Sequence, residues 1–269
     1  MTDTYLPEFG FNQLAMTRHG PMLVNRYDTY VGASVIRLGE YSRDEADLLT
    51  QVLHPGQVAV EVGANMGTLS VPMAQRLGPD GRLYAFEPQR LMFQTLCANI
   101  ALNSLANVLA LPYAVGESQR DVLVPETAPE QFTNFGAIAL GGTGARTRQV
   151  TIDEYDLPAC HLLKIDVEGA EAAVIRGAVQ TILRHRPMLY VENDRRHLSP
   201  ALIQLIGSFG YGLFWHLPRL ESGDDFNQTA EPVFPGYVSV NMFCVPINPG
   251  AKVQGLAPVT SLHDWPVPV

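Results

Sequence analysis

The chain has 269 residues, of which 46% are hydrophobic and 17% charged, a composition typical of globular proteins long enough to bury a core. The formal net charge is −9, and no run of lysines and arginines offsets it, which excludes duplex nucleic acid as an expected partner. Three cysteines at unrelated spacings predict buried thiols in a reducing compartment, and they argue against a disulfide framework or a zinc cluster.

The N-terminal residues MTDTYLPEFGFNQ have neither the basic nor the apolar region of a secretory signal, and no apolar run is long enough for a membrane span. These features predict a cytoplasmic protein. We expect an N-terminal appendage over residues 1–53, a main domain over 54–246 and a Pro-rich, irregular tail over 247–269. The appendage is a candidate for homodimer formation or for substrate selection, and the sequence does not separate these roles.

Within the appendage, residues 30–41 (YVGASVIRLGEY) alternate weakly in polarity and predict a strand or hairpin. Ser42 and Glu45 then form a capping-box pattern, which predicts a helix that ends near Leu53.

Strand and helix patterns alternate from residue 57 onward. This order predicts an α/β fold with a doubly wound, mostly parallel sheet, helices on both faces and an antiparallel C-terminal edge. The expected strands lie at residues 58–62, 82–86, 107–115, 162–166, 187–192, 211–217 and 237–246.

Helices are expected between these strands, and Pro72 should bend the first of them. A stripe of Val174, Ala178 and Ile182 predicts one continuous helix. Residues 116–150 fit this alternation least well. Their Gly-rich part, 134–145 (NFGAIALGGTGA), predicts a mobile loop over the site.

A glycine turn follows the first strand of the main domain, in the sequence EVGANMG. Gly63 permits a tight turn and Gly67 a close backbone approach, at the edge of the sheet where doubly wound folds bind nucleotides. Glu87 ends the next strand, about 20 residues later, where a carboxylate accepts hydrogen bonds from ribose hydroxyls.

The same turn discriminates between two cofactors. A dinucleotide site needs a central glycine where this chain has Asn65, and a carboxylate at Glu61 would repel a pyrophosphate. Glu61 suits the cationic amino-acid end of S-adenosylmethionine. The residues therefore favour S-adenosylmethionine over NAD, and a turn that binds no ligand is the remaining alternative.

Four stretches, VAVEVGANMGTLSVPMA, YAFEP, LLKIDVEGAE and NMFCVP, together resemble the FkbM-type S-adenosylmethionine-dependent methyltransferases. The resemblance runs from about Gly39 to Pro246, and it departs from the family at Glu61, where Asp is more usual. It implies a Rossmann-like class I methyltransferase fold and methyl transfer, usually to a hydroxyl oxygen of a natural product, sugar or lipid. It does not identify the acceptor.

The resemblance also implies site residues. Those expected to bind the cofactor are Glu61, Gly63, Ala64, Asn65, Gly67, Glu87, Pro88, Gln89, Ala114, Val115 and Asp166. Asn134, Phe135 and Asn193 are expected to contact the acceptor.

Catalytic roles are expected at the carboxyl ends of the fourth and fifth strands, for Asp166, Glu168, Glu192 and His197. Helix capping is the alternative for Asp166 and Glu168, and the general base is open among Asp166, Glu192 and His197. Asp166, Glu192 and Asn193 have a spacing similar to that by which some class I oxygen methyltransferases hold magnesium or calcium, but we expect no metal.

Two other functions remain open at this point. One is a nicotinamide-dependent oxidoreductase of Rossmann type, and the other is a protein that binds S-adenosylmethionine without catalysis.

Overall fold

The computed structural model describes residues 8–221, 223–229, 232–247 and 253–266. The expectations for residues 1–7 and for parts of the tail (248–252 and 267–269) therefore lie outside the described residues.

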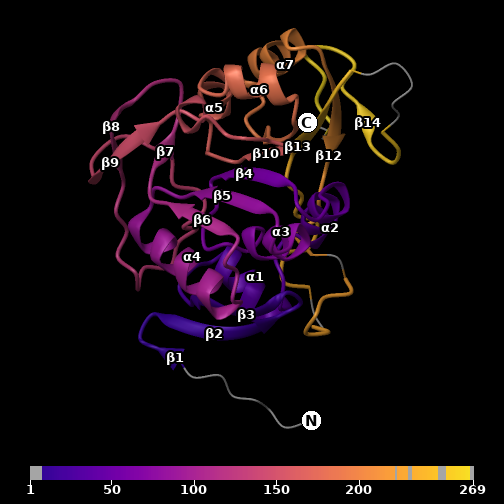
Figure 1. Ribbon diagram of the computed structural model, residues 1–269. Helices are drawn as coiled ribbons and strands as arrows, with labels where there is room; N and C mark the ends of the chain where they lie inside the picture. The colour runs from indigo at the N-terminus through magenta and orange to yellow at the C-terminus, as the bar shows by residue number, and fades with distance from the viewer. Residues whose placement is uncertain (1–7, 222, 230–231, 248–252, 267–269) are drawn as a thin grey trace.

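A sheet of eight strands forms the centre of the molecule (Figure 1). Its order is β14 (Ala257–Pro258), β12 (Tyr211–His216), β13 (Asn241–Pro246), β11 (Met188–Glu192), β10 (Leu162–Ile165), β4 (Val58–Val62), β5 (Arg82–Phe86) and β6 (Val108–Leu111).

The five strands from β6 to β11 are parallel, whereas β13 pairs antiparallel with β11 and with β12. In the parallel part, Ile165 pairs with Val62 on one side and with Val191 on the other, so β4, β10 and β11 end at the same level. The expected mostly parallel α/β sheet with an antiparallel C-terminal edge is confirmed. This register brings residues that follow three different strands to one edge of the sheet.

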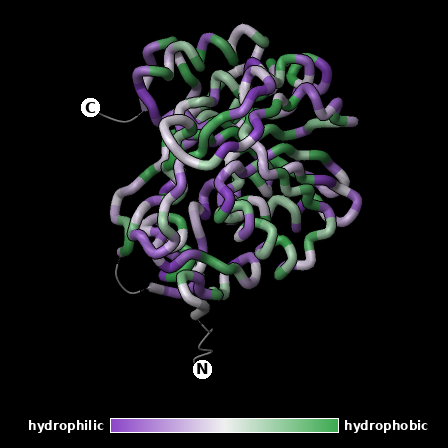
Figure 2. The backbone as a smooth tube through the Cα atoms, turned by 90° about the vertical axis from the view of Figure 1, so that its left-hand side faces the viewer, coloured by the Kyte–Doolittle hydropathy of each residue, from purple (hydrophilic) through white to green (hydrophobic). Residues whose placement is uncertain are grey.

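Helices cover both faces of the sheet (Figure 1). One face carries α5 (Glu171–Arg176), α6 (Val179–His185) and α7 (Ser199–Ser208). The other carries α2 (Arg43–Val52), α3 (Ser70–Leu77) and α4 (Arg90–Leu102). Hydrophobic and hydrophilic residues alternate along the outer elements in Figure 2, as expected when each packs one side on the core. None of the described helices has the length and apolar character needed to cross a membrane.

Residues 30–41 do not form the expected strand or hairpin. They contain helix α1 (Val31–Leu38), whose buried Val31, Val35 and Leu38 recur at a helical spacing, and Gly39 ends it in the left-handed region with φ 70°. The weak alternation of polarity predicted a strand because it hid the repeat of apolar residues every three to four positions, which is typical of a helix. Helix α2 does begin after Ser42, although the Ser42 side chain makes no capping hydrogen bond.

Two helical details also differ from expectation. Helix α3 begins at Ser70, so Pro72 lies in its first turn, where a missing N–H costs no intrahelical hydrogen bond, and the bend stays a prediction. The expected single helix through Ala178 is divided into α5 and α6 by Gly177 and Ala178, although its stripe remains buried.

The region from 116 to 150 contains a hairpin, which the sequence patterns did not predict. Strands β8 (Arg120–Val124) and β9 (Ala145–Val150) pair antiparallel, and β7 (Ala114–Val115) joins β9 in a small second sheet. The Gly-rich segment is the loop between β8 and β9. The tail is not wholly irregular, because β14 pairs with β12.

An antiparallel unit of β1 (Glu8–Phe9), β2 (Asn12–Thr17) and β3 (Gly20–Asn25) lies outside the helices (Figure 1). Its Met22 and Val24 belong to a buried cluster with Val35, Met66 and Met92. The N-terminal segment thus shares a core with the elements that carry the glycine turn.

Candidate active-site cavity

A cavity of about 300 Å³ opens at the carboxyl edge of the parallel strands. Its walls come from residues that follow β4, β5, β10 and β11, from residues 134–140 of the Gly-rich loop, and from residues 238–241 before β13. Parallel α/β sheets bind ligands at this edge because the loops after neighbouring strands meet there. Of the described cavities, this one therefore has the position expected of an active site.

The glycine turn after β4 is shaped by its closeness to β10. A Cβ atom on Gly63 would lie 1.8 Å from the carbonyl oxygen of Asp166, and Gly63 has φ 84°. Asn65 also lies in the left-handed region, with φ 50°, and its side-chain oxygen accepts a hydrogen bond from the Met66 backbone N–H. The turn therefore brings backbone to the cavity where any larger residue would clash.

Glu87 follows β5 and is buried against this turn. Its two carboxylate oxygens accept hydrogen bonds from the backbone N–H groups of Asn65 and Gln89, both at 2.8 Å. Burial raises its pKa to about 7, against the opposing effect of these two donors. Glu87 lines the cavity together with the expected Pro88, Gln89, Ala114 and Val115.

Lys164 is a site residue that the sequence analysis missed. It lies in β10 directly beside Glu61 of β4, and its ammonium is 3.6 Å from a Glu61 oxygen and 3.3 Å from Asp166 Oδ2. The Ser70 hydroxyl donates to the other Glu61 oxygen at 2.5 Å. Glu61 thus has a protein cation as its partner. A lysine within an otherwise apolar strand was the available sequence signal.

Three carboxyl groups converge just beyond Lys164. Asp166, Glu168 and Glu192 each offer an oxygen, and these atoms lie within 4.8 Å of one another. Glu168 has φ 57° and accepts a hydrogen bond from Arg195 Nη2 at 2.5 Å. Burial and, next, the Asp166 carboxylate together raise the pKa of Glu168 to about 7, against the lowering effect of Arg195.

Glu192 is the most perturbed of these groups. Burial, followed by repulsion from Asp166 and Asp194, raises its pKa well above the usual range, and its buried Oε2 has no hydrogen-bond partner within the described part of the chain. The fifth strand therefore delivers a carboxyl group that favours its neutral form.

Four expected site residues lie away from the cavity wall. Phe135 is buried in the core under the loop, and His197 is exposed. The Asn193 amide donates to Ser199 Oγ at 2.9 Å, so Glu168 takes the place beside Asp166 and Glu192 that was expected for Asn193. Gly67 packs against Leu96, which a Cβ atom would approach to 2.8 Å. The other expected residues, Glu61, Gly63, Ala64, Asn65, Asn134, Asp166, Glu168 and Glu192, do line it.

The N-terminal helices contribute a wall that the sequence did not reveal. Tyr30, Tyr41 and Glu45 line the cavity, although they precede the glycine turn by 16 residues or more. Burial raises the pKa of Glu45 to about 7, against the lowering effect of Lys164. Tyr30 makes edge-to-face contacts with Tyr41, at 6.4 Å between centroids, and with Phe234, at 5.5 Å.

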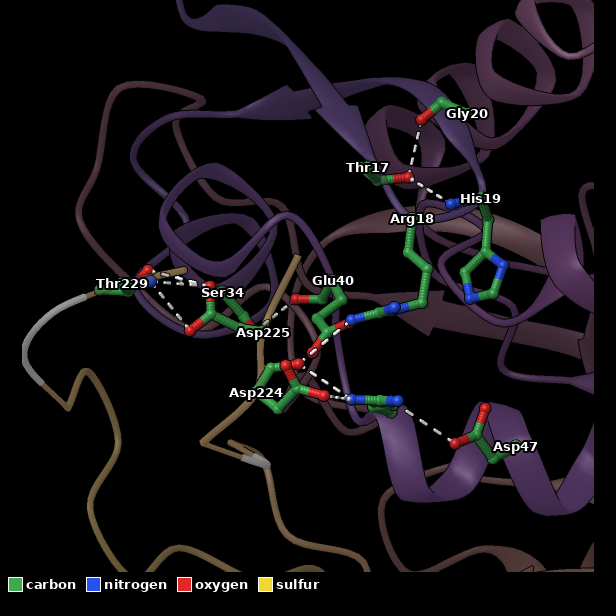
Figure 3. Close-up of polar contacts among 11 residues, drawn as sticks. Thr17, Arg18, His19, Gly20, Ser34, Glu40, Asp47, Asp224, Asp225 and Thr229 are labelled. Carbon is green, nitrogen blue, oxygen red and sulfur yellow. Dashed lines mark hydrogen bonds and ion pairs between the residues drawn. The ribbon is translucent and has the colours of Figure 1, made fainter. Parts of the chain in front are cut away.

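Polar contacts hold this wall to a late segment of the chain, residues 223–229 (Figure 3). Arg43 pairs with Asp224 at 3.2 Å, and Arg18, which pairs with the buried Glu40, also donates to the Asp224 carbonyl at 3.2 Å. Thr229 donates to the Arg37 carbonyl at 2.8 Å. Segments about 180 residues apart in the chain are thereby joined beside the cavity.

Comparison with known proteins agrees with this architecture. Residues 61–213, more than half of the chain, match the family described as Methyltransferase FkbM domain. The methyltransferase sdnD of Sordaria araneosa is 30% identical over 155 residues, which cover 44% of this chain and 59% of that protein. The chain thus matches less than two thirds of that relative's length.

Two solved structures show similar folds. The methyltransferase FkbM from Methylobacillus flagellatus is 17% identical with a TM-score of 0.47, covering 82% of this chain and 55% of that one. Fibrillarin from Aeropyrum pernix, solved with natively bound S-adenosyl-L-methionine, is 13% identical with a TM-score of 0.44, covering 89% of this chain and 84% of that one. At these identities and TM-scores, the two structures support no conclusion about the reaction.

Proposed function

Because this chain belongs to the FkbM methyltransferase family and takes S-adenosylmethionine as its cofactor, we propose that it methylates a hydroxyl oxygen of a small-molecule, sugar or lipid-type acceptor. Family membership decides against the nicotinamide-dependent alternative.

Cys97, Cys160 and Cys244 are free thiols, which supports a cytoplasmic location.

The cavity residues fit S-adenosylmethionine. The turn from Gly63 to Asn65 brings bare backbone to the wall, and Glu87 retains lone pairs for ribose hydroxyls after accepting its two backbone donors. The Glu61 carboxylate lies at the end suited to the cationic amino-acid part. When bound, the cofactor supplies a methyl group that its sulfonium charge activates.

The observation that carries the proposal is the position of Asp166. Its side chain is 38% exposed at the carboxyl end of β10, where it lines the cavity, and the Lys164 ammonium lies 3.3 Å from Oδ2. An alcohol needs its proton removed as it attacks, so a carboxylate held there suits a general base. The remaining contribution of the protein is to hold the hydroxyl in line with the methyl group.

The cofactor is tested first, by calorimetric titration with S-adenosylhomocysteine and, separately, with NAD. We expect micromolar binding of S-adenosylhomocysteine alone. Glu87→Ala should weaken it roughly tenfold to a hundredfold, since hydrogen bonds to a charged group contribute about 1.5–3 kcal/mol. The exposed Glu130→Ala is the matched control. Binding of NAD alone, or of neither compound, would contradict the proposal.

Catalysis is tested next, with methyl-labelled S-adenosylmethionine and a panel of hydroxylated acceptors. We expect a methyl ether as product. Asp166→Asn should lower kcat by about 10²-fold or more while S-adenosylhomocysteine affinity changes little, because the loss is that of a general base. A protein that only binds the cofactor would show no turnover in either form. Loss of turnover on chelation would instead assign the carboxylates to a metal.

A further inference from the structure

The cavity has far more acidic than basic groups at the end away from Glu87. Five acidic residues line that end: Glu45, Asp166, Glu168, Glu192 and Asp194. Within the described residues, Lys164 is the one lysine or arginine on the wall, and it already lies near two carboxylates, those of Glu61 and Asp166. An anionic acceptor would therefore be repelled from this end.

Two of these groups form no ion pair with any described residue, although Lys164 lies near enough to lower the pKa of Glu45. Arg195 pairs with Glu168 at 2.5 Å and more distantly with Asp194 at 3.9 Å. Neither Glu45 nor Glu192 has an ion pair among the residues that the structure describes, and Glu192 Oε2 also lacks a hydrogen bond there. A buried carboxyl group such as Glu192, with an oxygen that has no partner, is costly to ionise, and a ligand cation would relieve that cost.

Aromatic rings border the same end. Tyr30 and Tyr41 both line the cavity, and each has its pKa raised first by burial and further by negative charge that includes Glu192. Phe234 and Tyr237 extend this aromatic group, with ring centroids 6.3 Å apart. Aromatic faces combined with carboxylates are the chemistry that proteins use to hold organic ammonium groups.

We infer that the acceptor carries a protonated amine near the hydroxyl to be methylated, held by Glu192 and its acidic neighbours beside Tyr30. The inference rests on the proposed function, because it names the acceptor class for the same cavity. Amino sugars and amino alcohols belong to this class, whereas phosphorylated and carboxylated acceptors are excluded by charge.

A divalent cation is the rival occupant, since oxygens of Asp166, Glu168 and Glu192 lie within 4.8 Å of one another. Two observations favour the amine. Glu168 already has one carboxylate oxygen bonded to the Arg195 guanidinium, which competes with a metal for this group, and the tyrosine rings offer nothing to a metal that prefers oxygen anions. The acidic groups also extend as far as Glu45, which is not among those three.

The test uses the full chain saturated with S-adenosylhomocysteine, at pH 7.5, and three probes of similar shape: 2-phenylethylamine, 2-phenylethanol and 3-phenylpropionate. Calorimetry should show the amine binding at least tenfold more tightly than the alcohol, and the acid most weakly. Glu192→Gln should reduce the amine preference to less than threefold. The exposed Glu130→Gln should leave it unchanged, and an unaltered S-adenosylhomocysteine affinity shows that each variant is folded.

Equal affinity for the alcohol and the amine, or no binding of the amine, overturns the inference. The inference is also overturned if Mg²⁺ or Mn²⁺ binds tightly, Glu192→Gln abolishes that binding, and the alcohol probe binds only when the metal is present. A protein that fails to bind S-adenosylhomocysteine in the first step contradicts the proposed function itself. One that binds it without preferring the amine contradicts only the acceptor class.

Discussion

Lys164 is a single buried cation among several acids. Burial alone lowers its pKa, but the carboxylates of Asp166, Glu61 and Glu45 outweigh burial and raise it above the ordinary lysine value. Its ammonium lies between the side chains of Glu61 and Asp166 at the ends of adjacent strands. We infer that Lys164 is a positioning residue, which sets the orientation and charge of Asp166 without touching the acceptor.

Replacing this residue tests that role. Lys164→Met should lower the free energy of unfolding by about 3–5 kcal/mol, because it leaves buried carboxylates without their cation. The loss should shrink as the pH falls from 8 to 6, because burial raises the pKa of Glu45 to about 7 and that of Glu61 above its ordinary value, so these acids take up protons there. This pH dependence separates a charge effect from a packing effect. Urea unfolding at the two pH values measures it. Arg82→Met, exposed at the start of β5, should cost less than about 0.5 kcal/mol.

At the scale of elements, adjacent strands determine the shape of the glycine turn. Strands β4 and β10 are parallel neighbours in register, so the residues that follow them leave the sheet side by side. That closeness explains why the position after Val62 has no room for a side chain, with Asp166 O 1.8 Å from the site of a Cβ atom.

Gly63→Ala should therefore lower the free energy of unfolding by more than the strain of a positive φ alone would. Gly78 is the matched control, because it also has positive φ, 68°, but nothing lies within 4 Å of its Cβ position. We expect Gly78→Ala to lower the free energy of unfolding by about 1–3 kcal/mol, because φ 68° with ψ −179° is a conformation that almost only glycine adopts. Gly63→Ala should cost several kcal/mol and abolish S-adenosylhomocysteine binding, as measured by urea unfolding and calorimetry. Equal costs would show that the contact with Asp166 is relieved by movement.

At the scale of the whole molecule, Arg18 and Arg43 both contact Asp224 and so join the N-terminal wall to residues 223–229 (Figure 3), but their ion pairs differ in burial. Arg18→Ala removes one ion pair of the buried Glu40 and should lower the free energy of unfolding by about 1–3 kcal/mol. Arg43→Ala removes a pair with Asp224, which is 86% exposed, and should cost less than about 1 kcal/mol. Thermal unfolding of both variants measures the difference, and an equal loss would contradict this ranking.

The buried acids also give the whole protein an unusual pH dependence. Burial raises the pKa of Glu45 and of Glu87 from 4.5 to about 7, so between these values the unfolded chain releases protons that the folded chain retains. Stability in the absence of ligand should therefore fall as pH rises from 5 to 7 and level off above that, by at most about 3 kcal/mol per group. Glu45→Gln should flatten the curve measured by urea unfolding. A rise in stability over this window would contradict the assignment.

Local patterns in the sequence determined the alternation of strands and helices, the glycine turn and the carboxylates at strand ends. Each is set by residues within a few positions of one another, and parallel crossovers then bring the strand ends to one edge. Helix α1, the β8–β9 hairpin and the break between α5 and α6 were exceptions. A short apolar segment such as α1 suits a strand or a helix until packing selects one.

Only the tertiary structure decided which distant groups meet at that edge. It placed Lys164 between Glu61 and Asp166, and it added Tyr30, Tyr41 and Glu45 from the N-terminal part of the chain. It also left His197 in solvent and Phe135 in the core. The physical reason is that contacts across a sheet or between separate segments depend on packing and register, which no local spacing records.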